Sequence, residues 1–300
     1  MIDFFFKSCY NYSVEFFTIV LEDYMDHKKL EELKSYAAKI RLLALEGVHA
    51  AKSGHPGGSL SIADLLSYLY FYKLNVDPKN PNWDDRDRFV LSKGHTAPAL
   101  YGALALKGFF PESEISKLRQ VDSFLQGHPD MKHTPGVDMT TGSLGLGISA
   151  ACGMALSGKL YNKDYRVYTI VGDGESEEGQ VWEACMFAAH YSLDNLCVIF
   201  DWNGLQIDGP IAEVMNPTPF DKKLEAFGFN VISIDGHDLE QIDAAITAAE
   251  QFKGKPTAII AKTVKGKGVS FMENNVSWHG SAPSDEQYEQ AVAEIKATMN

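Results

Sequence analysis

The chain has 300 residues, of which 45% are hydrophobic and 22% charged, with 25 glycines and 12 prolines. This composition is typical of a globular protein and excludes disordered, collagen-like and coiled-coil chains. Forty acidic residues against 27 basic ones give a net charge of −13 at pH 7, so we expect neither nucleic acid nor a membrane as a partner. The four cysteines have no metal-binding or disulfide spacing and lie in apolar stretches, which favours reduced thiols in a cytoplasmic protein.

The beginning of the chain differs from the remainder. Residues 2–21 are rich in Phe and Tyr but also carry charges such as Lys7 and Glu15, so they match neither a membrane-spanning helix nor a secretory signal peptide. We predict that residues 1–24 are an N-terminal extension without a functional role and that residues 25–300 form one domain. The alternative is that the extension is a packed or membrane-peripheral helix.

The first half of the chain shows helical patterns separated by loops. Apolar residues recur at helical spacing from Leu30 to Leu45, and the glycine- and proline-rich residues 53–59 end this pattern. Further apolar runs stop at prolines or glycines, so we expect this half to consist of helices and long loops. These runs lie at residues 62–74, 97–106 and 148–158.

The second half alternates short β-branched runs with longer helical segments. Strands separated by helices of this length imply right-handed crossovers and a parallel sheet. We therefore predict an α/β fold, a parallel sheet flanked by helices, with ligands bound at the carboxyl ends of the strands. Strands are predicted at residues 166–171, 196–200, 229–234 and 256–261, and helices at residues 178–191 and 239–252.

A glycine-rich acidic turn follows the first of these strands. Gly172 and Gly174 have no Cβ atoms to keep a diphosphate away from the backbone, and the next helix offers free N–H groups to an anion. An acidic residue, Asp173, lies between them and would repel bare phosphate. It suits Mg²⁺ instead, because this ion prefers oxygen ligands and commonly binds phosphates as well.

The following strand provides the other ligands. Asn203 lies 30 residues after Asp173 and follows the strand at residues 196–200. Since adjacent parallel strands are about 4.8 Å apart, both side chains can reach one ion. We predict Mg²⁺ bound by Asp173, the amide oxygen of Asn203 and the backbone carbonyl of Leu205. The alternative is a pair of ordinary glycine- and asparagine-containing turns.

These residues and several other segments resemble the transketolase family. Gly172-Asp173-Gly174 followed by Asn203 is similar to its thiamine-diphosphate fingerprint, and the resemblance covers residues 26–300. It implies a thiamine-diphosphate-binding fold, with thiamine diphosphate and Mg²⁺ as cofactors. The other matching segments are Ser53-Gly54-His55-Pro56-Gly57, Leu91-Ser92-Lys93-Gly94-His95, Gly127-His128-Pro129, Thr140-Thr141-Gly142-Ser143-Leu144-Gly145, Asp235-Gly236-His237-Asp238 and Trp278-His279-Gly280.

Four histidines in glycine-flanked loops are the candidate catalytic residues. One such histidine alone is usually a solvated or capping side chain, but near neutral pH imidazole can donate to a hydroxyl, accept from it or move its proton. The resemblance implies that His55 and His279 contact the hydroxyl and carbonyl oxygens of the substrate. It also implies that His95 helps to hold the cofactor and that His128 contacts the first hydroxyls of the donor sugar.

Four more positions are implied only by the resemblance. Gly142 and Leu144 would meet the aminopyrimidine and the diphosphate region of the cofactor. Lys262, just after the last strand, would be the lysine near the cofactor, or simply an exposed lysine at a strand end. Glu178 would be the glutamate that joins the two active sites of a dimer, or an ordinary acidic residue in the first turn of a helix.

A whole transketolase is roughly twice as long as this chain, and the resemblance places its cofactor-activating glutamate and its sugar-phosphate-binding residues in the half that this chain lacks. We therefore expect a C-terminal partner subunit with the pyrimidine-binding and third domains, and an assembly of two copies of each subunit. The expected reaction is transfer of a two-carbon ketol unit from a ketose phosphate to an aldose, within the pentose phosphate pathway and carbohydrate metabolism. The cofactor would supply the carbanion chemistry.

Three alternatives remain open from the sequence. The chain could be part of another thiamine-diphosphate enzyme, such as a deoxyxylulose-phosphate synthase or a dehydrogenase E1 component. It could belong to a split transketolase for a specialised sugar, including a sulfonated or branched one. It could also be a binding subunit without catalytic activity, although the four histidines, Asp173 and Asn203 argue against loss of the chemistry.

Overall fold

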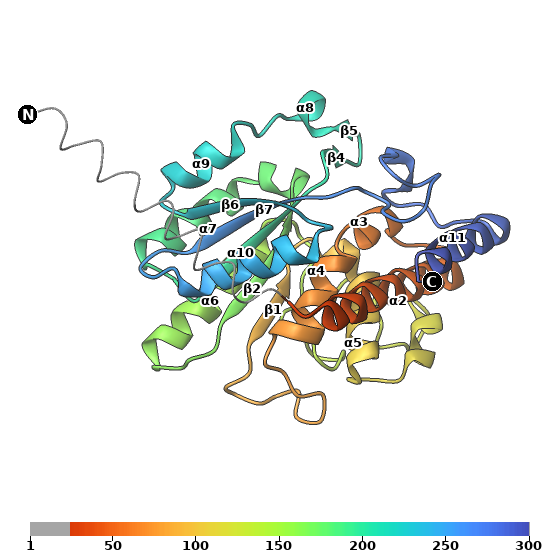
Figure 1. Cartoon of the computed structure of the whole chain (residues 1–300), viewed down its shortest axis with the longest axis horizontal. Coiled ribbons are helices and arrows are strands. Elements are labelled where there is room, and N and C mark those ends of the chain that lie inside the picture. The colour runs from red at the N-terminus through yellow and green to blue at the C-terminus, as the bar shows by residue number, and fades with distance from the viewer. Residues whose placement is uncertain (1–24, 300) are drawn as a thin grey trace, which may run out of the picture.

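A computed structural model describes residues 25–299, so the predicted extension at residues 1–24 lies outside the described part of the chain. The strands of the main sheet are β1 (Arg88–Leu91), β2 (Val167–Gly172), β3 (Leu196–Trp202), β6 (Asn230–Asp235) and β7 (Thr257–Lys262). They are all parallel and lie in the order β1-β2-β3-β7-β6 (Figure 1). A separate antiparallel pair consists of β4 (Leu205–Gln206) and β5 (Gly209–Pro210).

The predicted parallel sheet is confirmed, and burial explains its sequence pattern. Every residue of β2 is buried, and β3 is buried up to its last residue. Strands that are covered on both faces read as nearly continuous apolar runs. Their side chains alternate between two cores, since Tyr168 and Ile170 belong to one and Val167 and Val171 to the other.

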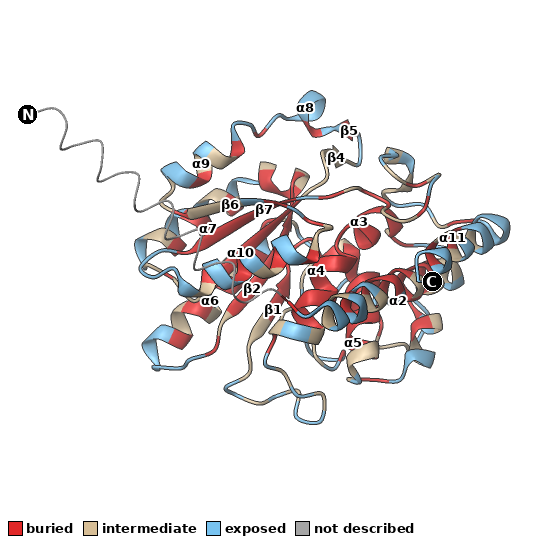
Figure 2. Cartoon of the chain, in the orientation of Figure 1, coloured by how far each residue is buried: buried red, intermediate tan, exposed pale blue. Residues whose placement is uncertain are grey.

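Helices cover both faces of this sheet. The helices of residues 25–299 are α2 (His27–Ala51), α3 (Pro56–Ser61), α4 (Ala63–Tyr68), α5 (Ala97–Lys107), α6 (Leu146–Leu160), α7 (Gly179–His190), α8 (Ile211–Val214), α9 (Phe220–Ala226), α10 (Leu239–Gln251) and α11 (Asp285–Ala297). Residues of α6, α7 and α9 form one core with the sheet, and residues of α2, α4, α5 and α10 form the other. Figure 2 shows the buried strands between helices whose outer surfaces are exposed. Among residues 25–299, no helix combines the length and the apolar character needed to cross a bilayer.

Several elements were not predicted from the sequence, namely β1, α11, the short helices α3, α8 and α9, and the pair of β4 and β5. The first half contains a strand, β1, which pairs with β2 at the edge of the sheet; it has only four residues and begins with an arginine. Near the end of the chain, α11 is a further helix, although Ser284 and Gln287 form the capping box that marks its start. The apolar run at residues 62–74 is also divided, into α4 and a π-helical turn at Leu69–Lys73.

The carboxyl ends of three neighbouring strands lie in register at one edge of the sheet. Gly172 of β2 is paired with Asp201 of β3, and Trp202 of β3 is paired with Lys262 of β7. Residues that follow these strands therefore emerge side by side. This register brings the loops after β2, β3 and β7 to one place, where the predicted metal ligands lie.

Candidate active site

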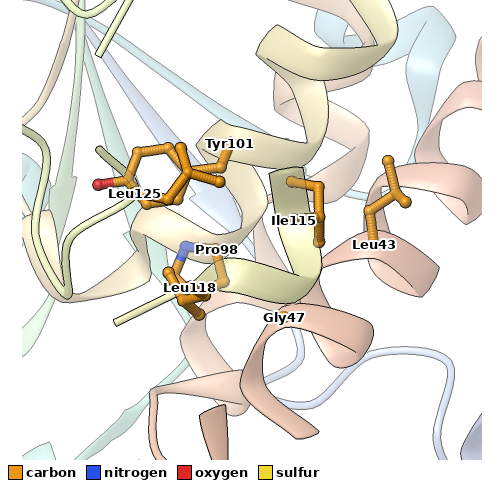
Figure 3. Close-up of a pocket in the computed structure, with 7 residues that line it drawn as sticks. All are labelled: Leu43, Gly47, Pro98, Tyr101, Ile115, Leu118 and Leu125. Carbon is orange, nitrogen blue, oxygen red and sulfur yellow. The ribbon is translucent and has the colours of Figure 1, made fainter. Parts of the chain in front are cut away.

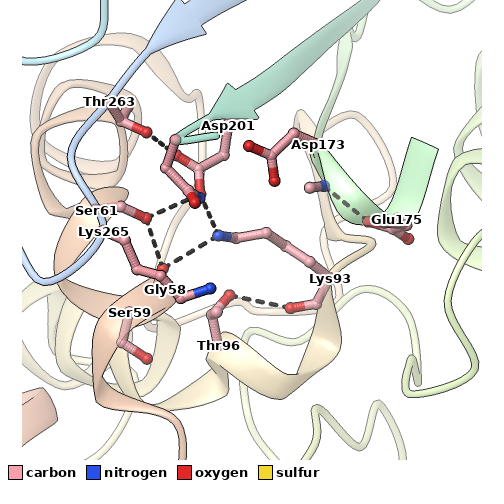
Figure 4. Close-up of polar contacts among 12 residues, drawn as sticks. Gly58, Ser59, Ser61, Lys93, Thr96, Asp173, Glu175, Asp201, Thr263 and Lys265 are labelled. Atoms are coloured by element: carbon pink, nitrogen blue, oxygen red, sulfur yellow. Dashed lines mark hydrogen bonds and ion pairs between the residues drawn. The ribbon is translucent and has the colours of Figure 1, made fainter. Parts of the chain in front are cut away.

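The predicted metal site centres on Asp173, which directly follows β2. Its buried carboxylate accepts hydrogen bonds from the backbone N–H groups of Gly174 (2.8 Å) and Gly204 (2.5 Å). Burial, followed by the negative charge of Asp201, raises the pKa of Asp173 to about 7. Figure 4 shows the two aspartates close together at the ends of neighbouring strands. A bound cation would stabilise the charged form of such a carboxylate.

Asn203 and Leu205, the other two predicted ligands, follow β3. Gly204 between them is the residue whose N–H group contacts Asp173. The Asn203 side chain is held at both ends, because Oδ1 accepts from the Leu205 N–H group (3.1 Å) and Nδ2 donates to Asp201 (3.0 Å). The Leu205 carbonyl accepts from the Lys265 ammonium group (3.0 Å), so this oxygen already faces a cation.

This donor set fits a hard divalent cation. A carboxylate, an amide oxygen and a backbone carbonyl are oxygen ligands of the kind that Mg²⁺ takes. Within residues 25–299 no cluster of three or more His, Cys, Asp or Glu side chains is arranged to hold a metal. A metal in the described part of the chain would therefore depend on mixed oxygen ligands such as those of Asp173, Asn203 and Leu205.

The backbone N–H groups of the two glycines beside Asp173 donate within the turn itself. The Gly172 N–H group donates to Glu175 (2.9 Å) and the Gly174 N–H group donates to Asp173, so neither is free for an anion. A Cβ atom on Gly174 would lie 2.9 Å from Cβ of Gln206, which explains the glycine by packing. A 3₁₀ turn, Gly174–Glu177, also separates this loop from α7. The glycines thus shape the turn that carries Asp173.

A buried ion pair, which was not predicted, adjoins the loop after β3 that carries Asn203. Lys93 and Asp201 are fully buried, and Lys93 Nζ lies 2.5 Å from Asp201 Oδ2. Asp201 also accepts hydrogen bonds from Ser61 and Thr263 (Figure 4). Burial alone would raise the pKa of Asp201, but Lys93 and these hydrogen bonds outweigh it and lower the pKa. Asp201 in turn orients the Asn203 amide, so the pair acts on a predicted metal ligand.

The four predicted histidines come together in one cluster. The ring centroid of His55 lies 5.2 Å from that of His95, 5.6 Å from that of His279 and 6.4 Å from that of His128. The rings of His95 and His279 are 5.1 Å apart. These residues are up to 224 positions apart in the chain. The fold therefore assembles the cluster from separate loops.

Burial lowers the pKa of every histidine in this cluster. The pKa of His55 falls to about 4 and that of His279 to about 3, while the pKa values of His95 and His128 are also lowered. Burial is the largest cause in each case, and nearby lysine or arginine charges lower each pKa further. The rings are therefore neutral near pH 7, and each has one hydrogen-bond donor and one acceptor.

A lysine that was not predicted, Lys265, contacts both a predicted metal ligand and the histidine cluster. Lys262, the last residue of β7, is exposed. Lys265 is buried, and its Nζ atom lies 3.0 Å from the Leu205 carbonyl and 3.0 Å from Nδ1 of His279. Burial, followed by the charge of Lys93, lowers the pKa of Lys265 to about 8. Lys265 thus connects Leu205, in the loop after β3, with the histidine cluster.

The glycine-rich loop that precedes α6 borders the histidine cluster. A Cβ atom on Gly142 would lie 3.5 Å from the His128 ring, and one on Gly94, beside His95, would lie 2.6 Å from Thr141. Gly142 is exposed and Leu144 is half-buried. The small residues let this loop approach both histidine turns closely.

Glu178 lies at the start of α7. It is the exposed N-cap residue, and its side chain packs close to Gly145. Its exposed position is compatible with either role considered from the sequence.

The segment Asp235-Gly236-His237-Asp238 belongs to a structural network. Nδ1 of His237 lies 2.7 Å from Asp64, and Nε2 accepts from the Val264 N–H group (2.9 Å). Asp64 also binds Arg41 of α2 at 2.5 Å. These contacts fasten the loop after β7, which leads to Lys265, onto α2 and α4. His237 therefore holds the site in place from outside the cluster.

None of the predicted site residues lines the apolar pocket shown in Figure 3. Its lining residues are Leu43, Gly47, Pro98, Tyr101, Ile115, Leu118 and Leu125. The Tyr101 hydroxyl donates to the backbone carbonyls of Gln126 and His128, both at 2.9 Å. This pocket therefore lies behind the loop that carries His128 and supports that loop rather than forming the chemical site.

Comparison with known proteins identifies a family for this fold and site. The family model described as "Transketolase, thiamine diphosphate binding domain" matches residues 33–298. The chain is 48% identical over 265 residues to the 6-deoxy-6-sulfo-D-fructose transketolase subunit SqwG of Clostridium sp. (strain MSTE9), covering 88% of this chain and 96% of that protein. It is 45% identical over 274 residues to the transketolase of Rattus norvegicus, covering 90% of this chain and 43% of that protein.

A solved structure agrees with these matches. The crystal structure of transketolase from Campylobacter jejuni superposes with a TM-score of 0.83 at 37% identity, covering 88% of this chain and 42% of that chain. The chain therefore spans less than half the length of the rat and Campylobacter proteins and almost the whole length of the clostridial subunit.

Proposed function

Because the chain belongs to the transketolase family, we propose that it is the diphosphate-binding subunit of a two-chain transketolase, which transfers a two-carbon ketol unit from a ketose phosphate to an aldose. One observation carries this proposal: the loops after β2, β3 and β7 bring Asp173, Asn203 and Lys265 to one edge of the sheet, and Lys265 contacts His279 of the four-histidine cluster. That arrangement supports an anchored cofactor beside polar groups for a sugar.

The proposed roles follow from the contacts of each residue. Asp173, Asn203 and Leu205 would hold Mg²⁺, and the loop at Gly142 and Leu144 would meet the aminopyrimidine and diphosphate region. Thiamine diphosphate, when bound, supplies the carbanion chemistry. The chain itself orients the substrate, and its neutral imidazoles donate to or accept from sugar hydroxyls and carbonyl oxygens.

The proposal gives the lysine role to Lys265 and distinct roles to the histidines. His55 and His279 would contact reacting oxygens of the substrate, His95 would help to hold the cofactor, and His128 would contact the first hydroxyls of the donor. Buried Lys265 supports this assignment better than exposed Lys262, because only Lys265 contacts His279.

We also propose a C-terminal partner subunit and an assembly with two copies of each. The similarity to a protein named as a subunit supports this, as does a group of exposed apolar residues on and after α6 and α7. Obligate interfaces are large and apolar. Glu178, exposed at the start of α7, would lie at the contact between the two copies. The residues of this group are Leu146, Leu160, Tyr161, Met186, Phe187 and Tyr191.

A cytoplasmic location is part of the proposal. Cys152, Cys185 and Cys197 are free and buried. Burial raises the pKa of the Cys152 and Cys197 thiols to about 12, which keeps them unreactive. Free thiols without disulfides are typical of reducing compartments.

A specialised donor is the second candidate. The match to the SqwG subunit extends over 96% of that protein, which is named for 6-deoxy-6-sulfo-D-fructose. A sulfonated ketose carries its anion at the end remote from the reacting carbons, as a ketose phosphate does. In either case the four-histidine cluster would contact the reacting end of the sugar, so its proposed role is the same for both substrates.

The test is ketol transfer by the reconstituted enzyme. The full chain is combined with a companion chain that carries the pyrimidine-binding and third domains of transketolase, together with thiamine diphosphate and Mg²⁺. Xylulose 5-phosphate and 6-deoxy-6-sulfofructose are compared as donors to an aldose. We expect transfer that needs both chains and both cofactors. Cofactor binding by the complex without transfer from either donor would contradict the proposal and favour a non-catalytic subunit. A complex that acts only on another class of thiamine-diphosphate substrate would favour a synthase.

A further inference from the structure

One arginine joins the two loops that carry His55 and His128. Arg119 lies in the connection between α5 and α6, and its Nη1 atom donates to the Ser53 hydroxyl (2.8 Å). Its Nη2 atom lies 3.4 Å from Nδ1 of His55. The same guanidinium group packs against Gly127, the residue before His128. A single side chain thus contacts both histidine loops.

Arg119 is exposed, and its backbone conformation and its contact with Gly127 determine where the guanidinium group lies. The backbone of Arg119 has a φ of +59°, which is unusual for a residue other than glycine, and its N–H group donates to the Leu125 carbonyl (2.8 Å). A Cβ atom on Gly127 would lie 2.9 Å from Nε and 3.0 Å from Cζ of Arg119. Any larger residue at position 127 would displace the arginine. The contact therefore gives a reason for both Ser53 and Gly127, which belong to the matching segments but bear no catalytic group.

The contact between Arg119 and His55 determines where the imidazole proton lies. A guanidinium group is always protonated and can only donate hydrogen bonds, so Nδ1 of His55 must accept. A neutral imidazole has one proton, which must then be on Nε2. The Nε2 edge of the ring lies next to Gly280, where a Cβ atom would be 3.6 Å from Cδ2 and 3.7 Å from Nε2. The proton is therefore on the edge that faces the loop carrying His279.

We propose that Arg119 is a positioning residue that holds His55 as its Nε2–H tautomer and ties the Ser53–His55 loop to the Gly127–His128 loop. His55 then faces the substrate as a hydrogen-bond donor, and an acceptor for a hydroxyl proton must come from another member of the cluster. The consequence for the substrate rests on the proposed function, whereas the tautomer and the tie between the loops do not.

The charges around His55 agree with a neutral ring. Burial, followed by the Arg119 charge, lowers the pKa of His55 to about 4, and His128 and Lys265 act in the same direction. The rings of His95 and His279 face it from the other loops. The groups whose charges shift the pKa of His55 are Arg119, His128 and Lys265, which are all basic, so they favour the neutral ring.

The first test measures the tautomer directly. The full chain is labelled with ¹⁵N-histidine, and its imidazole nitrogens are observed by NMR at pH 7.5, with the His55 signals assigned by their loss in His55→Gln. We expect His55 in the parent chain to have a protonated Nε2 and an unprotonated Nδ1. In Arg119→Met both tautomers of His55 should be populated, so that the signals of the two nitrogens move toward each other. The pKa of His55 should also rise.

Two further variants make this test specific. Arg119→Lys retains the positive charge but has one nitrogen in place of the two that contact Ser53 and His55, so it should loosen the tie between the loops and weaken the preference for one tautomer while keeping the pKa of His55 low; it also serves if Arg119→Met does not fold. Lys132→Met removes an exposed cation from the same connection and should change neither signal. A proton on Nδ1 of His55 in the parent chain, or unchanged His55 signals in both Arg119 variants, would overturn the proposal.

A second test uses the reconstituted two-chain enzyme. Loss of positioning typically costs up to about a hundredfold in rate, so Arg119→Met should lower kcat by about tenfold to a hundredfold, with a smaller change in the KM for thiamine diphosphate. An unchanged kcat in a variant that has lost the tautomer would overturn the role of the tautomer in turnover. If the assembly transfers no ketol group at all, the NMR result still decides the proposal for Arg119, so the two failures can be distinguished.

Discussion

Nζ of Lys265 lies 3.0 Å from Nδ1 of His279, and the same ammonium group donates to the carbonyl of Leu205. The loop after β3 and the histidine cluster are therefore parts of one hydrogen-bonded unit. An ammonium group can only donate, so Nδ1 of His279 accepts and Nε2 carries the proton. A substitution at Lys265 should consequently affect both the loop that carries Leu205 and the ring of His279.

We expect Lys265→Met to lower the turnover of the reconstituted enzyme by about tenfold or more, because His279 loses the group that orients its ring. The pKa of His279 should also rise, since the charge of Lys265 contributes to lowering it. Steady-state kinetics and an NMR titration of His279 measure the two effects. The matched control is Lys262→Met, which removes an exposed lysine three residues away. Greater damage from Lys262→Met than from Lys265→Met would restore the original sequence-based assignment.

Asp173→Asn should abolish most Mg²⁺-dependent binding of thiamine diphosphate. Removing a residue in the second shell of a metal site typically costs about 10- to 100-fold in affinity, so loss of a carboxylate ligand should cost at least about a hundredfold. Calorimetric titration of the full chain with its partner measures this affinity. Asp208→Asn, the same change at an exposed aspartate in the β4–β5 turn, should leave it unchanged. Ketol transfer that survives Asp173→Ala combined with Asn203→Ala would disprove the metal assignment.

Lys93→Met should destabilise the folded chain by about 3–5 kcal/mol, because it leaves the charge of Asp201 buried without its partner. Urea denaturation at pH 7.5 measures the free energy of unfolding. The free energy of unfolding should fall less in the double variant Lys93→Met with Asp201→Asn than in Lys93→Met alone, because no unpaired charge remains in the double variant. An equal decrease in the free energy of unfolding in the single and double variants would show that the unpaired charge of Asp201 does not cause the destabilisation.

The histidine cluster should make the fold less stable in mild acid. The pKa values of His55 and His279 are lowered to about 4 and about 3, whereas those of unfolded histidines are about 6.5. Between these values the unfolded chain binds protons that the folded chain does not, so the free energy of unfolding falls as the pH decreases from about 6.5 toward 4. In the double variant His55→Asn with His279→Asn, the free energy of unfolding should depend less on pH between about 6.5 and 4. Urea denaturation at several pH values in this range measures the dependence. His133→Asn, at an exposed histidine, is the control, and an equal slope in the parent chain and the double variant would contradict the prediction.

Much of the sheet could be predicted because its strands are buried on both faces. The continuous apolar runs of β2, β3 and β7 have no other common explanation, and Asp173 and Asn203 follow two of them directly. β1 escaped prediction because four residues that begin with an arginine carry little pattern. Pairing with β2 stabilises it as a strand, and that pairing is a tertiary contact invisible in the local sequence.

The members of the site that were missed are those placed by long-range packing. Lys262 and Lys265 are equally plausible in sequence, since both follow the last strand. Gly266 decides between them, because it has a φ of +79°, its N–H group donates to the Gly57 carbonyl, and a Cβ atom there would lie 2.3 Å from the Met272 carbonyl oxygen. This turn carries Lys265 back toward the cluster. Arg119 and Asp201 were missed for the same reason. Arg119 contacts Ser53 and His55, and Asp201 contacts Lys93, all of which lie far away in the sequence.

The position of β7 has a consequence for synthesis of the chain. β7 is the last strand to be translated, yet it lies between β3 and β6. Until residues 257–262 have left the ribosome, β3 has an open edge and β6 has no neighbour in the sheet, and open edges invite pairing with other chains. Nascent chains that stop before Thr257 should therefore be the aggregation-prone species during expression, and a chaperone that shields the β3 edge should raise the yield of folded protein.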